Sequence, residues 1–268
     1  MSTGDILGLI FSYAYAISLL LLAETLYRRK PRILAHLLFS KEQSDRIDEL
    51  KSAQPPLEAA PTTKEADLYY VLTRKIIHIG AGMWIWAILL LFDHWWLAII
   101  PTATFILFNA LFLRFHIFSA MDPKEGVTPG TVYFAFSCTL LLFIFHLGWE
   151  QGFPRGYEYY AMAGIMAMTW GDAFATIIGK RFGKHSYAIP GGGGHKRTLE
   201  GSLAGFVFSF VAVAITLAIL SSLSLPIILL AAFIMALVAT LLEAISPWGT
   251  DNLTVPIGVS ILLFWLGF

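Results

Sequence analysis

The chain has 268 residues, of which 57% are hydrophobic and only 13% are charged, and its mean hydropathy is +0.70. Soluble domains usually carry about 25% charged residues, so this composition excludes an ordinary soluble domain and favours a protein built to sit in lipid. The formal net charge is zero, from 18 basic and 18 acidic residues, so the chain has no overall positive field that would attract nucleic acid.

Eight apolar runs follow one another along the chain. Each approaches the roughly 20 residues that a helix needs to cross about 30 Å of hydrocarbon. They predict transmembrane helices at about 6–26, 76–92, 95–113, 130–147, 158–178, 202–222, 225–243 and 254–268. The expected fold class is therefore all-α, a polytopic integral membrane protein with about eight transmembrane helices.

The basic residues predict the orientation of these helices. If the N-terminus lies outside, 17 of the 18 Lys and Arg residues fall in inner loops, and only Arg155 falls outside. Cytoplasmic loops carry the excess of basic residues, so we expect both termini on the outer side. The chain then divides into a first transmembrane helix (1–27), an inner-side amphipathic segment and linker (28–73), and a membrane-embedded domain (74–268).

The first polar candidates lie at the inner end of the second predicted span. Arg74 and His78 are four residues apart, so they share one face of a helix and could hold an anion. A basic membrane stop with a snorkelling arginine is the alternative interpretation.

A single aspartate lies inside the fifth predicted span. Asp172 is about seven residues, or about 10 Å of helix, from the inner loop. An aspartate at the bilayer centre costs roughly 2.5–3.5 kcal/mol on insertion scales, so it needs a cation or a hydrogen-bond donor. The same span repeats a small residue every fourth position, at Ala163, Ala167, Gly171, Ala175 and Gly179. Such a stripe lets a neighbouring helix approach closely, and a packing stripe with a capping carboxylate is the alternative.

The loop 179–202 carries four consecutive glycines, Gly191 to Gly194. Their backbone N–H groups could line a concave anion site. Lys184, Lys196 and Arg197 flank the glycines and supply positive charge for phosphate. Glu200 and Ser202 then open the next helix, whose N-terminus also favours an anion. A flexible connector would explain the glycines but not their charged neighbours.

Oxygen ligands gather where the last two spans meet the inner side. Glu243, Asp251 and Asn252 lie there, and Mg²⁺ accepts one or two carboxylates together with phosphate oxygens. A capped turn is the alternative for this segment alone. Together with Asp172 and the basic loop, it predicts a nucleotide–metal site that faces the inner compartment.

Four motifs occur in order: RKxxH, GDAxAxxxGxxxGKH, KRxxEGSxxGF and ExxSPxGxDNLxxP. Between about residues 70 and 260 the chain therefore resembles the membrane CTP-dependent lipid-alcohol kinases. This family includes phytol kinase, dolichol kinase and a fungal-type diacylglycerol kinase, and is related to phosphatidate cytidylyltransferases. One departure is Lys196-Arg197-Thr198, where the family often has Lys-Ser before the Glu-Gly-Ser block.

The resemblance implies that residues 74–268 form a membrane-embedded kinase domain that transfers the γ-phosphate of CTP, or of another nucleotide, to a prenyl-type alcohol. Length and loop order look most like phytol kinase and its bacterial relatives. The expected partners are a nucleoside triphosphate, a lipid alcohol from the bilayer and membrane lipids. Mg²⁺ or Mn²⁺ is the expected cofactor.

The resemblance also implies roles for the residues singled out above. The expected catalytic residues are Arg74, His78, Asp172 and Lys196. The expected nucleotide contacts are Lys184, Gly191, Gly192, Gly193, Gly194, Arg197, Glu200 and Ser202. The expected metal ligands are Asp172, Glu243, Asp251 and Asn252.

Two other functions remain open from the sequence. A phosphatidate cytidylyltransferase would use the same nucleotide to make CDP-diacylglycerol. An ion-coupled transporter would also explain a buried aspartate, but such transporters usually show paired repeats and a site near the middle of the membrane. Here the polar groups collect at one face and no repeat is visible.

Overall fold

The computed structural model describes residues 1–28, 64–117, 129–146, 156–189 and 196–268. This part of the chain contains one helix for each of the eight predicted spans. The helices are α1 (Thr3–Arg28), α4 (Lys64–Leu91), α5 (Trp95–Phe115), α6 (Gly130–Ile144), α7 (Glu158–Phe182), α8 (Leu199–Leu220), α9 (Leu225–Ile245) and α10 (Asp251–Trp265). The all-α prediction is confirmed. Six of these helices are long and apolar enough to cross a membrane, whereas α6 and α10 have 15 residues each.

Two helix starts differ from the sequence prediction. Helix α4 begins at Lys64, inside the segment assigned to the linker, because the ten residues from Lys64 to Thr73 include no Gly or Pro that would break a helix. Helix α10 begins at Asp251 rather than at 254 and contains Pro256. Proline has no N–H to donate to the carbonyl four residues earlier. The Ser137 hydroxyl of α6 donates to that carbonyl, of Asn252, at 2.5 Å.

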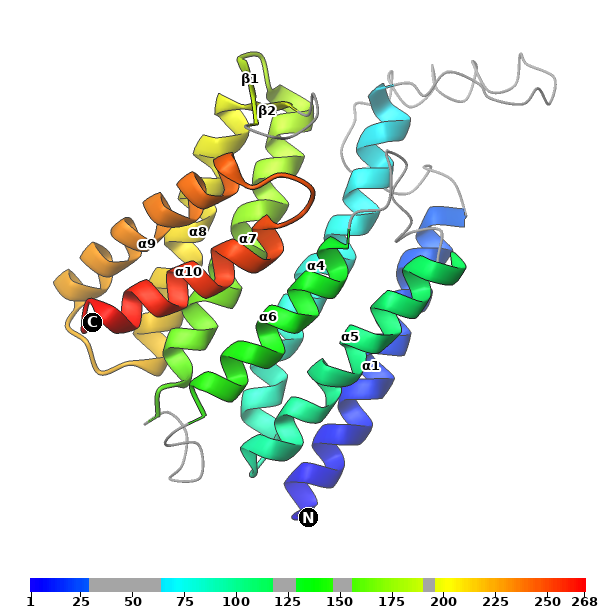
Figure 1. Ribbon diagram of the computed structural model, residues 1–268, viewed down its shortest axis with the longest axis vertical. Coiled ribbons are helices and arrows are strands. Elements are labelled where there is room, and N and C mark those ends of the chain that lie inside the picture. Colours follow the sequence, from blue (N-terminus) through cyan, green and yellow to red (C-terminus); the bar gives the residue numbers. More distant parts are fainter. Residues whose placement is uncertain (29–63, 118–128, 147–155, 190–195) are drawn as a thin grey trace.

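The helices form two groups that meet where α4 packs against α7 and where α6 packs against α10. Helices α7, α8, α9 and α10 pack against one another, and in the other group α1 packs against α4 and α5 while α5 packs against α6 (Figure 1). The close contact predicted from the small-residue stripe is confirmed at α7 and α8. A Cβ atom on Gly171 would lie 2.1 Å from the Ser209 hydroxyl oxygen, and one on Gly179 would lie 2.9 Å from that of Thr198.

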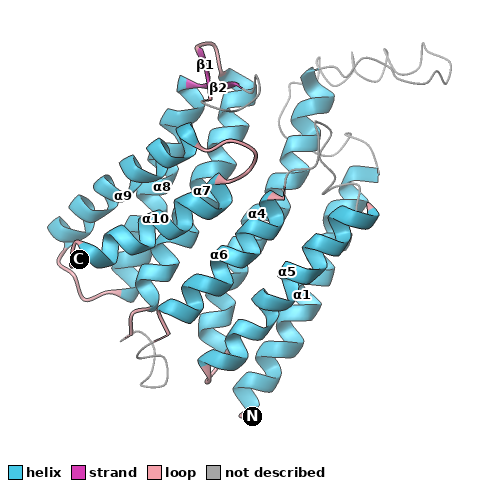
Figure 2. Cartoon of the chain, in the orientation of Figure 1, coloured by secondary structure: helices cyan, strands magenta, loops and turns pink. Residues whose placement is uncertain are grey.

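A short hairpin, which the sequence analysis did not predict, joins α7 to α8. Strands β1 (Ser186–Ala188) and β2 (Lys196–Thr198) pair antiparallel, with Tyr187 opposite Arg197. Figure 2 shows the hairpin at the end of the bundle where α4 begins, opposite the N-terminus. Thr198 caps α8 by accepting a hydrogen bond from the Gly201 N–H at 3.1 Å. The predicted glycine loop, Gly191 to Gly194, lies outside the described residues.

Candidate active site

The aspartate inside α7 has a cationic partner on α4. The Lys75 ammonium lies 2.5 Å from Asp172 Oδ2, and the two side chains are 16% and 10% exposed. His78 Nε2 lies 3.5 Å from the same oxygen and 3.4 Å from the Met168 carbonyl oxygen. The second oxygen, Asp172 Oδ1, accepts a longer hydrogen bond from the Thr176 hydroxyl at 3.3 Å. The arrangement satisfies a buried carboxylate that would otherwise be unfavourable inside the bundle.

Lys75 is a site residue that the sequence reasoning missed. It stands beside Arg74 in the RKxxH motif, where the pair also suits a basic membrane stop, and it lies three positions before His78. Residues three apart share a helix face, and on α4 that face meets α7. The spacing of Lys75 and His78, together with the need of Asp172 for a cation, was the signal that could have identified this residue.

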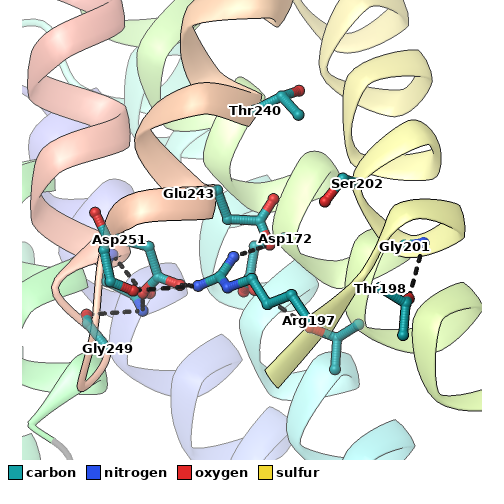
Figure 3. A network of polar contacts seen from close by, with 12 residues as sticks. Asp172, Arg197, Thr198, Gly201, Ser202, Thr240, Glu243, Gly249 and Asp251 are labelled. Atoms are coloured by element: carbon teal, nitrogen blue, oxygen red, sulfur yellow. Dashed lines mark hydrogen bonds and ion pairs between the residues drawn. The ribbon is translucent and has the colours of Figure 1, made fainter. Parts of the chain in front are cut away.

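A second ionic cluster joins the hairpin to the last two helices. Arg197 of β2 forms an ion pair with Glu243 of α9, and its Nη2 lies 2.9 Å from Asp251 Oδ2 of α10. Nη2 also donates to the Ser246 carbonyl at 3.4 Å. Figure 3 shows the guanidinium between the two carboxylates, with Asp172 nearby.

The Arg197 cluster bears on three predicted roles. Burial lowers the pKa of the Arg197 guanidinium, but the neighbouring carboxylates of Glu243 and Asp251 outweigh this effect and raise that pKa above its ordinary value. The arginine expected to contact phosphate is therefore paired with two of the expected metal ligands. Asn252, the remaining member of that set, donates to the Gly249 carbonyl and to Asp251 Oδ1 at 3.3 and 3.0 Å.

The other predicted nucleotide contacts lie at the hairpin. Glu200 accepts from His185 at 2.7 Å, and the Ser202 and Tyr187 hydroxyls are 2.6 Å apart. These bonds attach the hairpin to the first turn of α8. Lys184 and Lys196 are exposed and form no ion pair with any described residue, so their charges face the surroundings.

A cavity of about 290 Å³ lies between the two groups of helices. Its charged and amide-bearing lining residues are Arg74, Lys75, His78, Asn109, Asp172, Asp251 and Asn252. The rest of the lining is largely apolar and comes mostly from α1, α4, α5 and α6, with Thr176 of α7 and Gly249. The cavity thus brings together predicted residues from three motifs that are far apart in the sequence. Glu243 and Arg197 reach it only through their link to Asp251.

The fit of a divalent cation can be judged from the donor set. Within the described ranges, no group of three or more His, Cys, Asp or Glu side chains is placed to hold a metal ion. Asp172 and Asp251 are the two carboxylates that line the cavity. Mg²⁺ is commonly bound by one or two carboxylates plus substrate phosphates and waters. The residues present therefore fit an ion that arrives with a nucleotide, and not a preformed all-protein cage.

Comparison with known proteins shows extended similarity to two kinases. The chain is 34% identical over 202 residues to a phytol kinase of Synechocystis sp., an alignment that covers 73% of this chain and 79% of the relative. It is 26% identical over 214 residues to a probable chloroplastic phytol kinase of Triticum aestivum, covering 73% of this chain and 67% of the relative. No family model matches the chain, and no solved structure matches it.

Proposed function

Because the chain belongs to the phytol kinase family, we propose that it phosphorylates a prenyl-type alcohol, most specifically phytol, with CTP as the phosphoryl donor. It is a phosphotransferase with an alcohol acceptor. The proposal concerns the identity of both substrates and the residues that act on them.

The observation that carries the proposal is the two-sided character of the cavity. One part of its lining holds Lys75, His78 and Asp172, and the larger part is apolar. A lipid alcohol has the same division, with one hydroxyl and a long hydrocarbon chain. An amphiphile of this kind can enter sideways from the bilayer and bring its hydroxyl to the charged part of the lining.

Phosphoryl transfer depends mainly on in-line positioning and on neutralising charge. In the proposed reaction, the alcohol oxygen forms a bond to the γ-phosphorus while the bond from that phosphorus to the bridging oxygen breaks. The hydroxyl proton passes to Asp172, whose Oδ1 makes only the long contact with Thr176. Lys75 holds Asp172 in place through Oδ2, and His78 braces the same carboxylate. The products are the lipid monophosphate and CDP.

We place the nucleotide at the inner end of the cavity, beside the hairpin. Lys184 and Lys196 are exposed cations there, and we propose that they bind phosphate oxygens together with the glycines Gly191 to Gly194. Arg197 is proposed to act differently from the sequence expectation, because it is already paired with Glu243 and Asp251. Its role is to hold the hairpin, and hence Lys196, against α9 and α10. Glu200 and Ser202 also hold the hairpin in place, through their hydrogen bonds with His185 and Tyr187.

Mg²⁺ or Mn²⁺ is the cofactor in this proposal. Asp251 would hold the ion, and Asp172 would be its second ligand as the alternative to accepting the proton, because both line the cavity. The ion would neutralise charge on the nucleotide phosphates. Asn252 lies beside Asp251 and orients it through its amide. Glu243 would not touch the ion; it pairs with Arg197, which in turn holds Asp251.

The chain is a multi-pass membrane protein by the length and apolarity of its helices, and we propose that both termini are outside and the active site inside. Two contacts support the proposal that both termini lie at the same end of the helix bundle. Asp5 of α1 accepts from His94, in the turn between α4 and α5, at 2.7 Å. Tyr160, at the start of α7, donates to the carbonyl of the last residue, Phe268, at 2.9 Å.

The proposal is tested by a donor comparison. Detergent-purified protein is incubated with phytol and with CTP, ATP, GTP or UTP, with and without EDTA. We expect phytyl monophosphate to form fastest with CTP and not at all with EDTA, and we expect excess Mg²⁺ or Mn²⁺ to restore the reaction. Equal rates with all four nucleotides would contradict the assignment of CTP, and full activity in EDTA would contradict the assignment of the cation.

A further inference from the structure

We infer that the hydrocarbon chain of the alcohol lies along α4 in the apolar part of the cavity, and that Trp84 and Phe105 set the longest chain that the enzyme accepts. This inference rests on the proposed function, because it assigns the apolar lining to the alcohol substrate. It identifies specificity-determining residues that lie in the interior of the membrane-spanning helices and belong to none of the four sequence motifs.

The apolar part of the cavity is elongated along one helix. The lining residues of α4 run from Val71 to Ile85, which at 1.5 Å per residue is about 21 Å; the part from Arg74 to Ile85 is about 16 Å long. The first of them carry the polar groups, and the later ones, Ala81, Trp84 and Ile85, are apolar apart from one indole nitrogen. A linear chain with its hydroxyl at Asp172 would therefore extend towards Trp84.

The cavity ends at one level on three helices. The last lining residues towards the outer side are Ile85 on α4, Thr102 on α5 and Cys138 on α6. About one turn further, Ile88, Ala98 and Leu141 are each 0% exposed. The interior is therefore closely packed beyond this level, and a longer chain has no space to continue.

An aromatic pair lies within the last turn before the closed end. Trp84 and Phe105 meet edge to face, with their ring centroids 5.5 Å apart, and both line the cavity. Trp84 is 7% exposed. Its indole N–H has no hydrogen-bond partner among the described residues, so the ring is held by packing alone. A smaller side chain at this position would lengthen the cavity without breaking a polar contact.

Helix α1 forms the fourth wall and so belongs to the substrate site. Tyr15, Ala16, Leu19 and Leu20 line the cavity. The Tyr15 hydroxyl donates to the Gly80 carbonyl of α4 at 3.1 Å, and a Cβ atom on Gly80 would lie 2.6 Å from a Leu19 methyl carbon. Because of this close approach, α1 packs directly against α4 beside the apolar part of the cavity. The segment 1–27, treated in the sequence analysis as a separate helix, thus contributes to the kinase site.

The test compares Trp84→Leu with a matched control, Trp86→Leu. Trp86 is two residues further along α4, donates to the Met166 sulfur at 3.2 Å and lines a separate apolar groove. Prenyl alcohols from two to nine isoprene units are offered to each variant, and kcat/KM is measured for each length. A pocket changed by a few methylene groups alters such a ratio by roughly 10-fold or more. We expect Trp84→Leu to raise the ratio for long alcohols over phytol by at least about tenfold, and Trp86→Leu to leave it unchanged.

A second variant tests the same end of the cavity, and a second measurement reports alcohol binding separately from phosphorylation. Phe105→Leu should shift the ratio in the same direction, which covers the case in which Trp84→Leu does not fold. Labelling by photoreactive alcohols of the same lengths reports binding without turnover. An unchanged length ratio in both Trp84→Leu and Phe105→Leu overturns the inference even if phytol is phosphorylated. If the parent binds the alcohols with a length limit that these variants extend but phosphorylates none of them, the inference stands and the proposed function fails.

Discussion

Lys75 of α4 donates to the Asp172 carboxylate of α7 across 2.5 Å, in the interior of a bundle of apolar helices. This bond joins α4, whose group of helices lines the apolar part of the cavity, to α7, whose group carries the hairpin. An aspartate in this position is stable only with such a partner, so the pair is both a structural link and the centre of the proposed site.

The first prediction is that this pair behaves as a buried salt bridge. Lys75→Met leaves the Asp172 carboxylate without its cation and is expected to lower the free energy of unfolding by about 3–5 kcal/mol, the usual cost of removing one partner. Combining Lys75→Met with Asp172→Leu removes both charges and should restore most of that stability while the enzyme stays inactive. Denaturant titration in detergent measures both effects. A Lys75→Met protein as stable as the parent would contradict the structural role of the bond.

The second prediction separates two roles of Arg197. If it holds Glu243 and Asp251, Arg197→Met should destabilise the protein by about 3–5 kcal/mol. Arg197→Lys should recover only part of the loss, because lysine cannot reproduce the planar fork that reaches two carboxylates. Thermal unfolding and the KM for nucleotide are measured together. A stable Arg197→Met protein with a strongly raised nucleotide KM would show that the arginine binds phosphate instead.

The third prediction concerns the cations on the hairpin. Lys184→Ala and Lys196→Ala should each weaken nucleotide binding by about 1.5–3 kcal/mol, the range for a hydrogen bond to a charged group. Replacing Gly192 and Gly193 with Val should weaken it as well, because a β-carbon obstructs the backbone. Alcohol binding and stability should change little.

The matched control for these variants is Lys180→Ala, an exposed lysine at the end of α7. Nucleotide affinity is measured by equilibrium binding on the purified variants. Parental affinity in both lysine variants and in the valine variant would reduce the hairpin to a connector, and the phosphates would have to bind elsewhere.

The fourth prediction concerns sidedness. The native cysteine, Cys138, is 2% exposed, so it gives little background for thiol labelling. A cysteine at Lys184, in the hairpin segment, should react from the inner side only. One at Ser222, between α8 and α9 and exposed, should react from the outer side only. The opposite pattern in sealed vesicles would reverse the orientation and place the site outside.

The architecture could be predicted from the sequence because all eight spans are apolar and six of them are long enough to cross a membrane. The helices begin and end within a few residues of the predicted spans, with the exception of α4 at Lys64. The requirement of Asp172 for a partner was also predictable, since a lone carboxylate is costly in an apolar span. Its partner Lys75 was not identified, because a lysine beside an arginine at a helix entrance has a simpler explanation as a membrane stop.

The remaining features depend on contacts between distant elements. Arg197 was expected to bind phosphate, and nothing in its local sequence indicates that Glu243 and Asp251 come together around it. The strands of the hairpin have three residues each, too few for a periodic pattern. The place of α1 in the cavity wall follows from the packing of Gly80 against Leu19, which no motif records.

The central claim is tested most directly by following the phosphorus of the nucleotide. CTP labelled either at the γ-phosphate or at the α-phosphate is incubated with phytol and the purified enzyme, alongside Asp172→Asn and Glu158→Gln. Glu158 is the first residue of α7, at the end of the helix remote from the hairpin, and is the matched control. We expect the γ-label in phytyl monophosphate and the α-label in CDP. The rate of Asp172→Asn should fall by at least about 100-fold. The rate of Glu158→Gln should equal that of the parent. Transfer of the α-label to a lipid with release of pyrophosphate would contradict the account and identify a cytidylyltransferase.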